Sequence, residues 1–140
     1  MTDDGDAPKE NKERKYAKGE NRRKHVGSEP YARMVYKFGM WVGECPKGFS
    51  LDVAQALLQD AIPEFRSTAA QRPYRLWTYY DGAIYVAYRS NGDTWHACPN
   101  GLPKEEPPAS ILKQLEERAK KAGEEARLKQ WLRKRWDRKN

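Results

Sequence analysis

The sequence predicts an α+β fold with the element order β-α-β-β-β-α, in which one helix packs on a curled antiparallel sheet. Three observations support this fold class. Residues 51–62 carry apolar side chains at helical spacing. Three strand-like segments follow over residues 75–98, and the turn pairs Asp81-Gly82 and Asn91-Gly92 separate them. A second helical pattern then begins near residue 108.

The first strand is expected over residues 33–42, which are rich in β-branched and aromatic residues and end at Gly43. Gly39 inside this segment indicates a β-bulge. The first helix follows, because Ser50 is a favourable N-cap residue and Asp52 places a negative charge in the first turn. Pro63 marks its end, and its apolar face comprises Leu51, Ala54, Leu57, Leu58, Ala61 and Ile62.

The turns of the meander determine how its strands pair. Asp-Gly and Asn-Gly suit two-residue hairpin turns, because both central positions need positive φ. With such a turn at residues 91–92, Tyr88 lies opposite Trp95. A three-residue turn over residues 91–93 is the less favoured alternative, and it would move His96 to the other face of the sheet.

Because side chains alternate along a strand, this pairing gives the sheet two different faces. The expected core face, packed against the first helix, contains Trp77, Tyr79, Ile84, Val86, Tyr88, Trp95 and Ala97. The other face is half polar and contains Leu76, Thr78, Tyr80, Tyr85, Ala87, Arg89, Thr94, His96 and Cys98. Such a face suits RNA, because tyrosine can stack on bases, arginine can bind phosphate and histidine can transfer a proton near neutral pH.

The 140 residues divide into three segments by composition. Residues 1–30 carry 8 basic and 7 acidic side chains and almost no aliphatic ones, so a disordered charged arm is expected. Residues 31–103 hold nearly all the aromatic residues and form the α+β body. Residues 104–140, with 12 basic and 7 acidic side chains, form a linker and a basic C-terminal helix, with a break near Gly123.

Several classes of protein are excluded by what the sequence lacks. No stretch approaches the roughly 18 apolar residues of a membrane span, and the first 30 residues contain no apolar signal segment, so a cytoplasmic protein is expected. Cys45 and Cys98 lack the spacing of zinc sites or disulfide frameworks. Because no glycine-rich phosphate loop or metal-binding motif occurs, no cofactor and no metal are expected.

The half-polar face contains the candidate catalytic residues. His96 is the only histidine of the body and is the candidate acid or base, while Arg89 is the candidate phosphate stabiliser. Tyr85 and Thr78 are placed to orient the ribose or the phosphate. A carboxylate is an alternative base, but Glu64 is expected at a helix end, away from this face. The candidate substrate-binding residues of the body are Tyr80 and Arg75.

Positive charge is concentrated at the C-terminal end of the chain. Basic side chains there would contact phosphates without reading a base sequence. They would also favour a helix C-terminus through the helix dipole, so both interpretations remain open. The candidate phosphate-binding residues are Arg127, Lys129, Arg133, Lys134 and Arg135.

A series of short motifs runs through the second half of the chain: Leu76-Trp77, Asp81-Gly82-Ala83-Ile84-Tyr85, Gly92-Asp93-Thr94-Trp95-His96, Pro99, Pro107-Pro108 and Ile111-Leu112. In this order they resemble the pattern of predicted RNase domains found at the ends of bacterial polymorphic toxins and of some phage head-morphogenesis proteins. The resemblance covers residues 45–136. It departs from the family at Ala97-Cys98, where the family has Gly-Tyr, which puts any role of that pair in doubt.

This family is similar in fold to barnase, the colicin tRNA nucleases and the ribosome-dependent mRNA-cleaving toxins. The resemblance therefore implies a toxin-type endoribonuclease that cleaves RNA without a metal, through attack by the 2′-OH. It implies RNA, either tRNA or mRNA, as the main partner and a cognate acidic inhibitor protein as a second one. No membrane partner is expected.

Two other functions fit the same sequence. The helix-strand-strand-strand-helix order also suits a non-catalytic module that binds double-stranded RNA, although Glu105 and Glu106 stand where that module has a basic helix start. The chain also suits a protein-interaction or accessory module whose basic tail binds an acidic partner.

Overall fold

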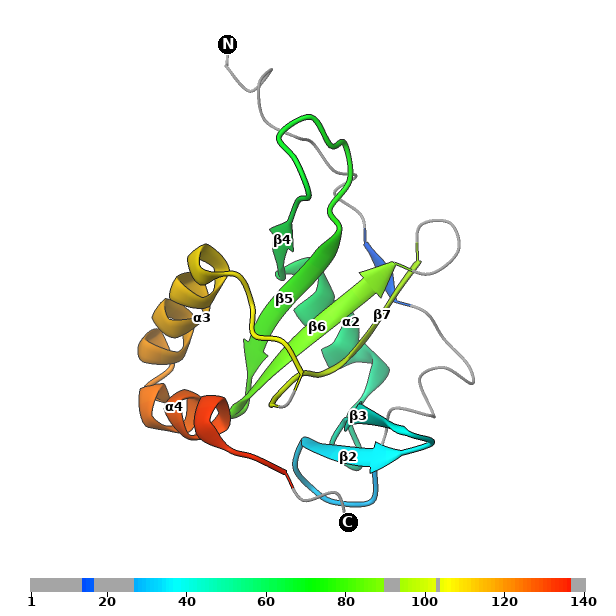
Figure 1. Cartoon of the computed structure of the whole chain (residues 1–140), viewed down its shortest axis with the longest axis vertical. Helices are drawn as coiled ribbons and strands as arrows, with labels where there is room; N and C mark the ends of the chain where they lie inside the picture. Colours follow the sequence, from blue (N-terminus) through cyan, green and yellow to red (C-terminus); the bar gives the residue numbers. More distant parts are fainter. Residues whose placement is uncertain (1–13, 17–26, 90–93, 103, 137–140) are drawn as a thin grey trace.

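The computed structural model describes residues 14–16, 27–89, 94–102 and 104–136, and in this part the protein is an α+β fold with three helices and two sheets (Figure 1). The predicted α+β class is confirmed, but the element order differs from the predicted β-α-β-β-β-α, and the larger sheet is not purely antiparallel. The larger sheet is mixed, in the order β1-β7-β6-β5-β4, and its strands are β1 (Lys15–Tyr16), β4 (Ile62–Glu64), β5 (Arg75–Tyr80), β6 (Ala83–Arg89) and β7 (Thr94–Pro99). The smaller sheet contains β2 (Arg33–Lys37) and β3 (Met40–Glu44). The helices are α2 (Leu51–Gln59), α3 (Ala109–Lys121) and α4 (Glu125–Arg133).

The single strand predicted over residues 33–42 is a hairpin of β2 and β3. Phe38 and Gly39 form its turn, with φ of 55° and 76°, and Lys37 pairs with Met40. A glycine within a β-rich segment is compatible with a turn as well as with the predicted bulge. The turn forms here because both central positions adopt the positive φ that a two-residue hairpin needs.

Helix α2 begins as predicted, where the Ser50 hydroxyl accepts a hydrogen bond of 3.1 Å from the backbone N–H of Val53. It ends earlier than predicted, at Gln59, and the next residues form the edge strand β4. An edge strand tolerates Pro63, which lacks an N–H to donate. Glu64 is therefore part of the sheet and does not lie at a helix end.

Residues 14–16 and 27–30 belong to the fold, although a disordered arm was predicted over residues 1–30. Strand β1 pairs with β7 in parallel, and Tyr16 is buried. The Arg14 guanidinium donates to the carbonyl oxygens of Leu58 at 2.7 Å and Ala61 at 2.9 Å. Arg14 thus ties the N-terminal segment to carbonyl groups at and just after the C-terminal end of α2. Residues 1–13 and 17–26 of the predicted arm lie outside the described residues.

The two predicted hairpin registers have different outcomes. Between β5 and β6 the prediction is confirmed, with Trp77 opposite Val86. Between β6 and β7 it is wrong by one residue, because Tyr88 lies opposite His96 and not opposite Trp95. This pairing is that of the three-residue alternative. It buries the Trp95 ring, which is 4% exposed, and a shift of one residue moves every side chain of β7 to the other face.

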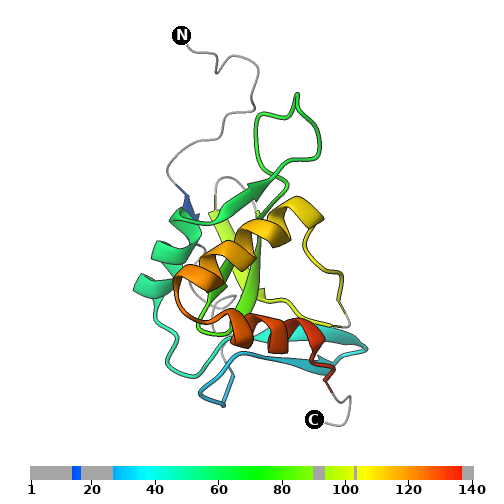
Figure 2. The ribbon, with the colours of Figure 1, turned by 90° about the vertical axis from the view of Figure 1, so that its left-hand side faces the viewer.

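Helices cover both faces of the larger sheet (Figure 2). Helix α2 packs on the face that carries Leu76, Ala87 and Trp95. Leu76 and Ala87 had been predicted on the half-polar face, and Trp95 on the core face. The face that carries Trp77 and Val86 packs against α3 and α4. The prediction that this face packs against the first helix is therefore wrong. The linker and C-terminal segment thus contribute to the core.

The break predicted near Gly123 is confirmed and lies between α3 and α4. Gly123 has a φ of 73°, and its N–H donates to the Lys120 carbonyl oxygen at 3.0 Å. The Glu124 N–H donates back to the Ala119 carbonyl oxygen at 2.8 Å. These bonds are typical of a Schellman motif, in which glycine supplies the left-handed residue. The turn allows both helices to lie on the same face of the sheet.

Candidate functional site

Four ionisable or polar side chains lie in line across strands β4 to β7. Glu64 is opposite Arg75, Arg75 is opposite Tyr88, and Tyr88 is opposite His96. Directly opposed residues of antiparallel strands share a face of the sheet. We call these four residues the cross-strand row. It brings a carboxylate, a guanidinium, a phenol and an imidazole together on the face that carries Trp77.

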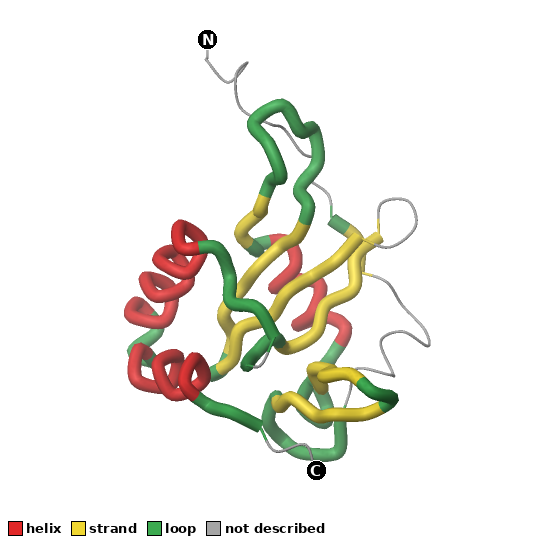
Figure 3. Tube along the Cα trace, viewed as in Figure 1, coloured by secondary structure: helices red, strands yellow, loops and turns green. Residues whose placement is uncertain are grey.

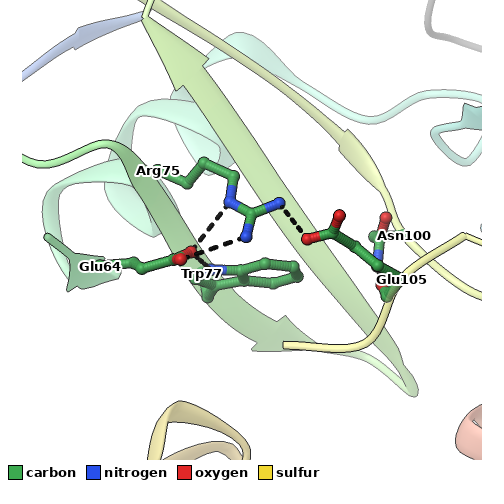
Figure 4. Close-up of polar contacts among 5 residues, drawn as sticks. All are labelled: Glu64, Arg75, Trp77, Asn100 and Glu105. Carbon is green, nitrogen blue, oxygen red and sulfur yellow. Dashed lines mark hydrogen bonds and ion pairs between the residues drawn. The ribbon is translucent and has the colours of Figure 1, made fainter. Parts of the chain in front are cut away.

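Glu64 and Arg75 form a two-point ion pair (Figure 4). Arg75 Nε donates to Glu64 Oε1 at 2.8 Å, and Arg75 Nη2 donates to Glu64 Oε2 at 3.1 Å. Trp77 Nε1 donates to the same carboxylate at 2.8 Å. Burial alone would raise the pKa of Glu64, but the hydrogen bonds from Arg75 and Trp77 outweigh it and hold that pKa below its ordinary value. The carboxylate is therefore ionised at neutral pH.

A second carboxylate reaches Arg75 (Figure 4). It comes from the linker between β7 and α3, which is drawn as a green loop in Figure 3. Arg75 Nη1 donates to Glu105 Oε2 at 2.8 Å. The buried Asn100 side chain donates to the Glu105 carbonyl oxygen at 2.9 Å and holds the linker in place. The Glu105 side chain is 67% exposed, whereas that of Arg75 is 8% exposed. The guanidinium is thus enclosed on the Glu64 side and covered by an exposed acidic group on the other.

Tyr88 and His96 form the other half of the row. Their ring centroids are 6.5 Å apart, and the rings are tilted by 42°. Burial raises the pKa of Tyr88, and the hydrogen bond from Arg75 partly offsets this. Burial lowers the pKa of His96, so the imidazole is mainly neutral at pH 7. The row therefore holds a charged pair at one end and a neutral imidazole at the other.

The structure separates the four predicted catalytic residues. His96 lies in the cross-strand row, whereas Thr78, Tyr85 and Arg89 lie on the opposite face. Thr78 and Tyr85 are buried on the α2 side of the sheet, and Tyr85 stacks on Phe49 with centroids 5.7 Å apart. Burial also raises the pKa of the Tyr85 phenol well above its ordinary range. The cause of this separation is the one-residue difference in the register of β7.

The predicted substrate-binding residues also occupy different places. Arg75 joins His96 in the cross-strand row, while Tyr80 packs edge-on against Phe49, with centroids 6.0 Å apart. Exposed Arg89 stacks on Trp95, with its guanidinium carbon 5.9 Å from the ring centroid. Sequence reasoning missed Glu64 and Glu105 as neighbours of Arg75. One sequence signal could have indicated Glu64. Ile62 and Glu64 alternate around Pro63, a pattern that is compatible with an edge strand.

The basic residues near the C-terminus fall into two groups. Arg127 Nη1 donates to Asp81 Oδ1 at 2.9 Å and to Glu124 Oε2 at 3.3 Å, so it joins α4 to the turn between β5 and β6. The others are exposed, and within the described part of the chain they make no ion pair; they are Lys129, Arg133, Lys134 and Arg135.

Comparisons with known proteins identify no relative. The chain matches no family model, and neither a curated protein nor a solved structure is significantly similar to it. In the part of the chain that the structure describes, no group of three or more His, Cys, Asp or Glu side chains could hold a metal ion. None of the described helices is both long and apolar enough to cross a membrane.

Proposed function

We propose that this protein binds RNA and cleaves it as a metal-independent endoribonuclease, with the reaction centred on the cross-strand row. The observation that carries this proposal is the register that lines up Glu64, Arg75 and His96 on one face. Cleavage of RNA through its 2′-OH needs a base, an acid and a cation near the phosphate. These three residues supply one group of each kind.

In the proposed reaction, the Glu64 carboxylate accepts the proton of the 2′-OH, and the 2′-oxygen attacks the adjacent phosphorus. Arg75 stabilises the negative charge of the pentacoordinate phosphate. His96, in its protonated form, donates a proton to the departing 5′-oxygen as the P–O5′ bond breaks. The products are a 2′,3′-cyclic phosphate and a 5′-hydroxyl. Tyr88, between the cation and the acid, is placed to hydrogen-bond the phosphate.

The spacing of the strands suits this assignment. Neighbouring strands lie about 4.8 Å apart, so the backbones of Glu64 and His96 are roughly 14 Å apart. A phosphodiester lying over Arg75 and Tyr88 would have the carboxylate on one side and the imidazole on the other. The substrate phosphate would replace the Glu105 carboxylate on Arg75, exchanging one anion for another.

The sequence resemblance to RNase toxin domains supports the same reaction. His96 matches the histidine of the family's Trp-His motif, and the order of one helix followed by an antiparallel meander fits the expected fold. A toxin-type nuclease acting on tRNA or mRNA would require an inhibitor in its own cell. The net charge of +7 favours an acidic inhibitor protein.

The proposal is tested by incubating tRNA and total RNA with the purified protein in EDTA and separating the products on a gel. The wild type is compared with His96→Ala and with Arg89→Ala, which removes an exposed cation from the opposite face. We expect cleavage by the wild type and by Arg89→Ala, and at least a 100-fold loss for His96→Ala. Equal cleavage by His96→Ala would overturn the assignment of the acid.

A second function, RNA binding without cleavage, is favoured by one observation. Two carboxylates neutralise Arg75, whereas the cations at the end of α4 make no ion pair with described residues. Salt-sensitive retention of RNA with no cleavage by any variant would support this function and reject the catalytic one.

A further inference from the structure

An open hollow of about 470 Å³ lies between segments that are far apart in the sequence. Its walls come from the residues before β2, the turn between β5 and β6, helix α4 and the segment after it. Figure 2 shows α4 in front of the hairpin of β2 and β3. The volume is within the range of roughly 300–1,000 Å³ that small-ligand sites occupy. The hollow is therefore large enough for a nucleotide.

One side of the hollow is aromatic. Tyr31 is 53% exposed at its edge. Trp136 packs edge-on against Trp131 with centroids 5.7 Å apart, and Trp131 Nε1 donates to the Asn100 carbonyl oxygen at 2.8 Å. The Nε1 atom of Trp136 is buried without a hydrogen-bond partner among the described residues. The Trp136 ring is thus anchored to the core through Trp131, and Tyr31 adds an exposed ring at the edge of the hollow.

The other side of the hollow is basic. Lys134 and Arg135 line it and are exposed, and neither makes an ion pair within the described ranges. Lys134 Nζ lies 4.4 Å from the centroid of the Trp136 ring, so a cation and an aromatic face adjoin. Lys129 and Arg133 continue the positive charge over the neighbouring surface of α4. Arg127 differs from these residues because Asp81 and Glu124 already neutralise it.

We propose that this hollow is a binding site for a nucleotide of single-stranded RNA, with the base against Tyr31 and Trp136 and the phosphates on Lys134 and Arg135. Aromatic rings beside exposed cations are the features that single-strand binding sites combine. An acidic peptide would use the cations but would leave the exposed Tyr31 ring without a stacking partner. The inference rests on the proposed function only for the choice of RNA as the polymer.

The position of the hollow defines its role. It adjoins the turn that follows β5, whereas Arg75 begins that strand, so the two sites are about 17 Å apart at about 3.3 Å per residue. A nucleotide in the hollow therefore lies several positions from the bond that the cross-strand row would cleave. It would position the substrate without taking part in the reaction.

The test is fluorescence anisotropy with a short, fluorescein-labelled, 2′-O-methylated oligonucleotide, which has no 2′-OH and cannot be cleaved through it. Tyr31→Ala and the pair Lys134→Ala/Arg135→Ala are compared with Lys120→Ala/Lys121→Ala, which removes two exposed charges from α3. We expect each hollow variant to bind about tenfold more weakly and the control within about twofold of the wild type. The slope of log affinity against log salt should become shallower by about 1.4 in the double hollow variant, for two lost phosphate contacts.

Several results would overturn this site: equal affinity in the hollow variants and the α3 control, equal binding of a duplex of the same length, or equally effective competition by polyglutamate. Cleavage of unmodified RNA by the same hollow variants is measured separately, which distinguishes this test from that of the proposed function. If the protein binds the oligonucleotide through the hollow and cleaves no RNA, only the catalytic proposal fails.

Discussion

The Arg75 guanidinium donates to the Glu105 carboxylate at 2.8 Å, although thirty residues separate the two in sequence. Arg75 is almost fully buried and Glu105 is largely exposed, so the acidic group covers the one nitrogen of the guanidinium that Glu64 does not bind. An approaching phosphate competes with this carboxylate for the same donor. The contact therefore sets how readily the cross-strand row accepts an anion.

Replacing Glu105 by Gln should increase the kcat/KM for RNA cleavage by several-fold. The substitution removes a negative charge that competes with the phosphate and leaves a side chain of similar size. Initial rates at low RNA concentration measure this effect. Glu106→Gln is the matched control, because Glu106 is exposed and adjacent. A fall in kcat/KM for Glu105→Gln alone would instead show that the carboxylate holds Arg75 in position for the reaction.

The rate of cleavage should have a maximum on the acidic side of neutrality. His96 must be protonated to act as the acid, and burial holds its pKa below the ordinary value of 6.5, so the rate falls as the pH rises through that pKa. Glu64 must be ionised, and its pKa lies below 4.5, so the rate falls again at lower pH. A pH profile of kcat/KM measures both limbs. A rate that rises steadily above pH 7 would contradict these roles.

Glu64→Gln should lower the free energy of unfolding by about 2 kcal/mol at pH 7, because Arg75 loses a charged partner in a mostly buried site. The pKa of Glu64 is lower in the folded state, so the stabilisation by the wild-type carboxylate is fully present above pH 4.5 and is lost as the pH falls through the folded-state value. Urea unfolding of both proteins at several pH values tests this. A stability difference that persists unchanged at the lowest pH would contradict the ion pair as its source.

Arg14→Ala should destabilise the protein by about 2 kcal/mol, although the residue belongs to the charged N-terminal segment. The substitution removes the donor to the carbonyl groups of Leu58 and Ala61 at the end of α2. Lys15→Ala, at the exposed neighbouring position, should change the stability by less than about 0.5 kcal/mol. Equal unfolding midpoints in urea for the two variants would show that residue 14 does not anchor the helix.

Local signals predicted much of this fold. Ser50 at the start of α2, the Asp81-Gly82 turn and the break at Gly123 each depend on the conformation of a few neighbouring residues. The predicted register of β7 was wrong. The register depends on which large side chain the core accommodates, and the burial of Trp95 decides it.

The candidate site was less predictable than the fold. Because the faces of β7 were exchanged, His96 was grouped with Tyr85 and Thr78 and separated from Arg75. Glu64 was considered as a base and set aside, because Pro63 was interpreted as the end of a helix, although a proline also fits an edge strand. Glu105 lies in a linker whose path depends on contacts distant in sequence.

The most direct test of the cross-strand row is the initial rate of cleavage of a defined oligoribonucleotide in EDTA by the wild type, Glu64→Gln and Arg89→Ala, with mass analysis of the product ends. We predict 2′,3′-cyclic phosphate and 5′-hydroxyl ends, a rate at least 100-fold lower for Glu64→Gln, and a rate within about twofold of the wild type for Arg89→Ala. Wild-type rates in folded Glu64→Gln, or the absence of cyclic phosphate ends, would contradict the account.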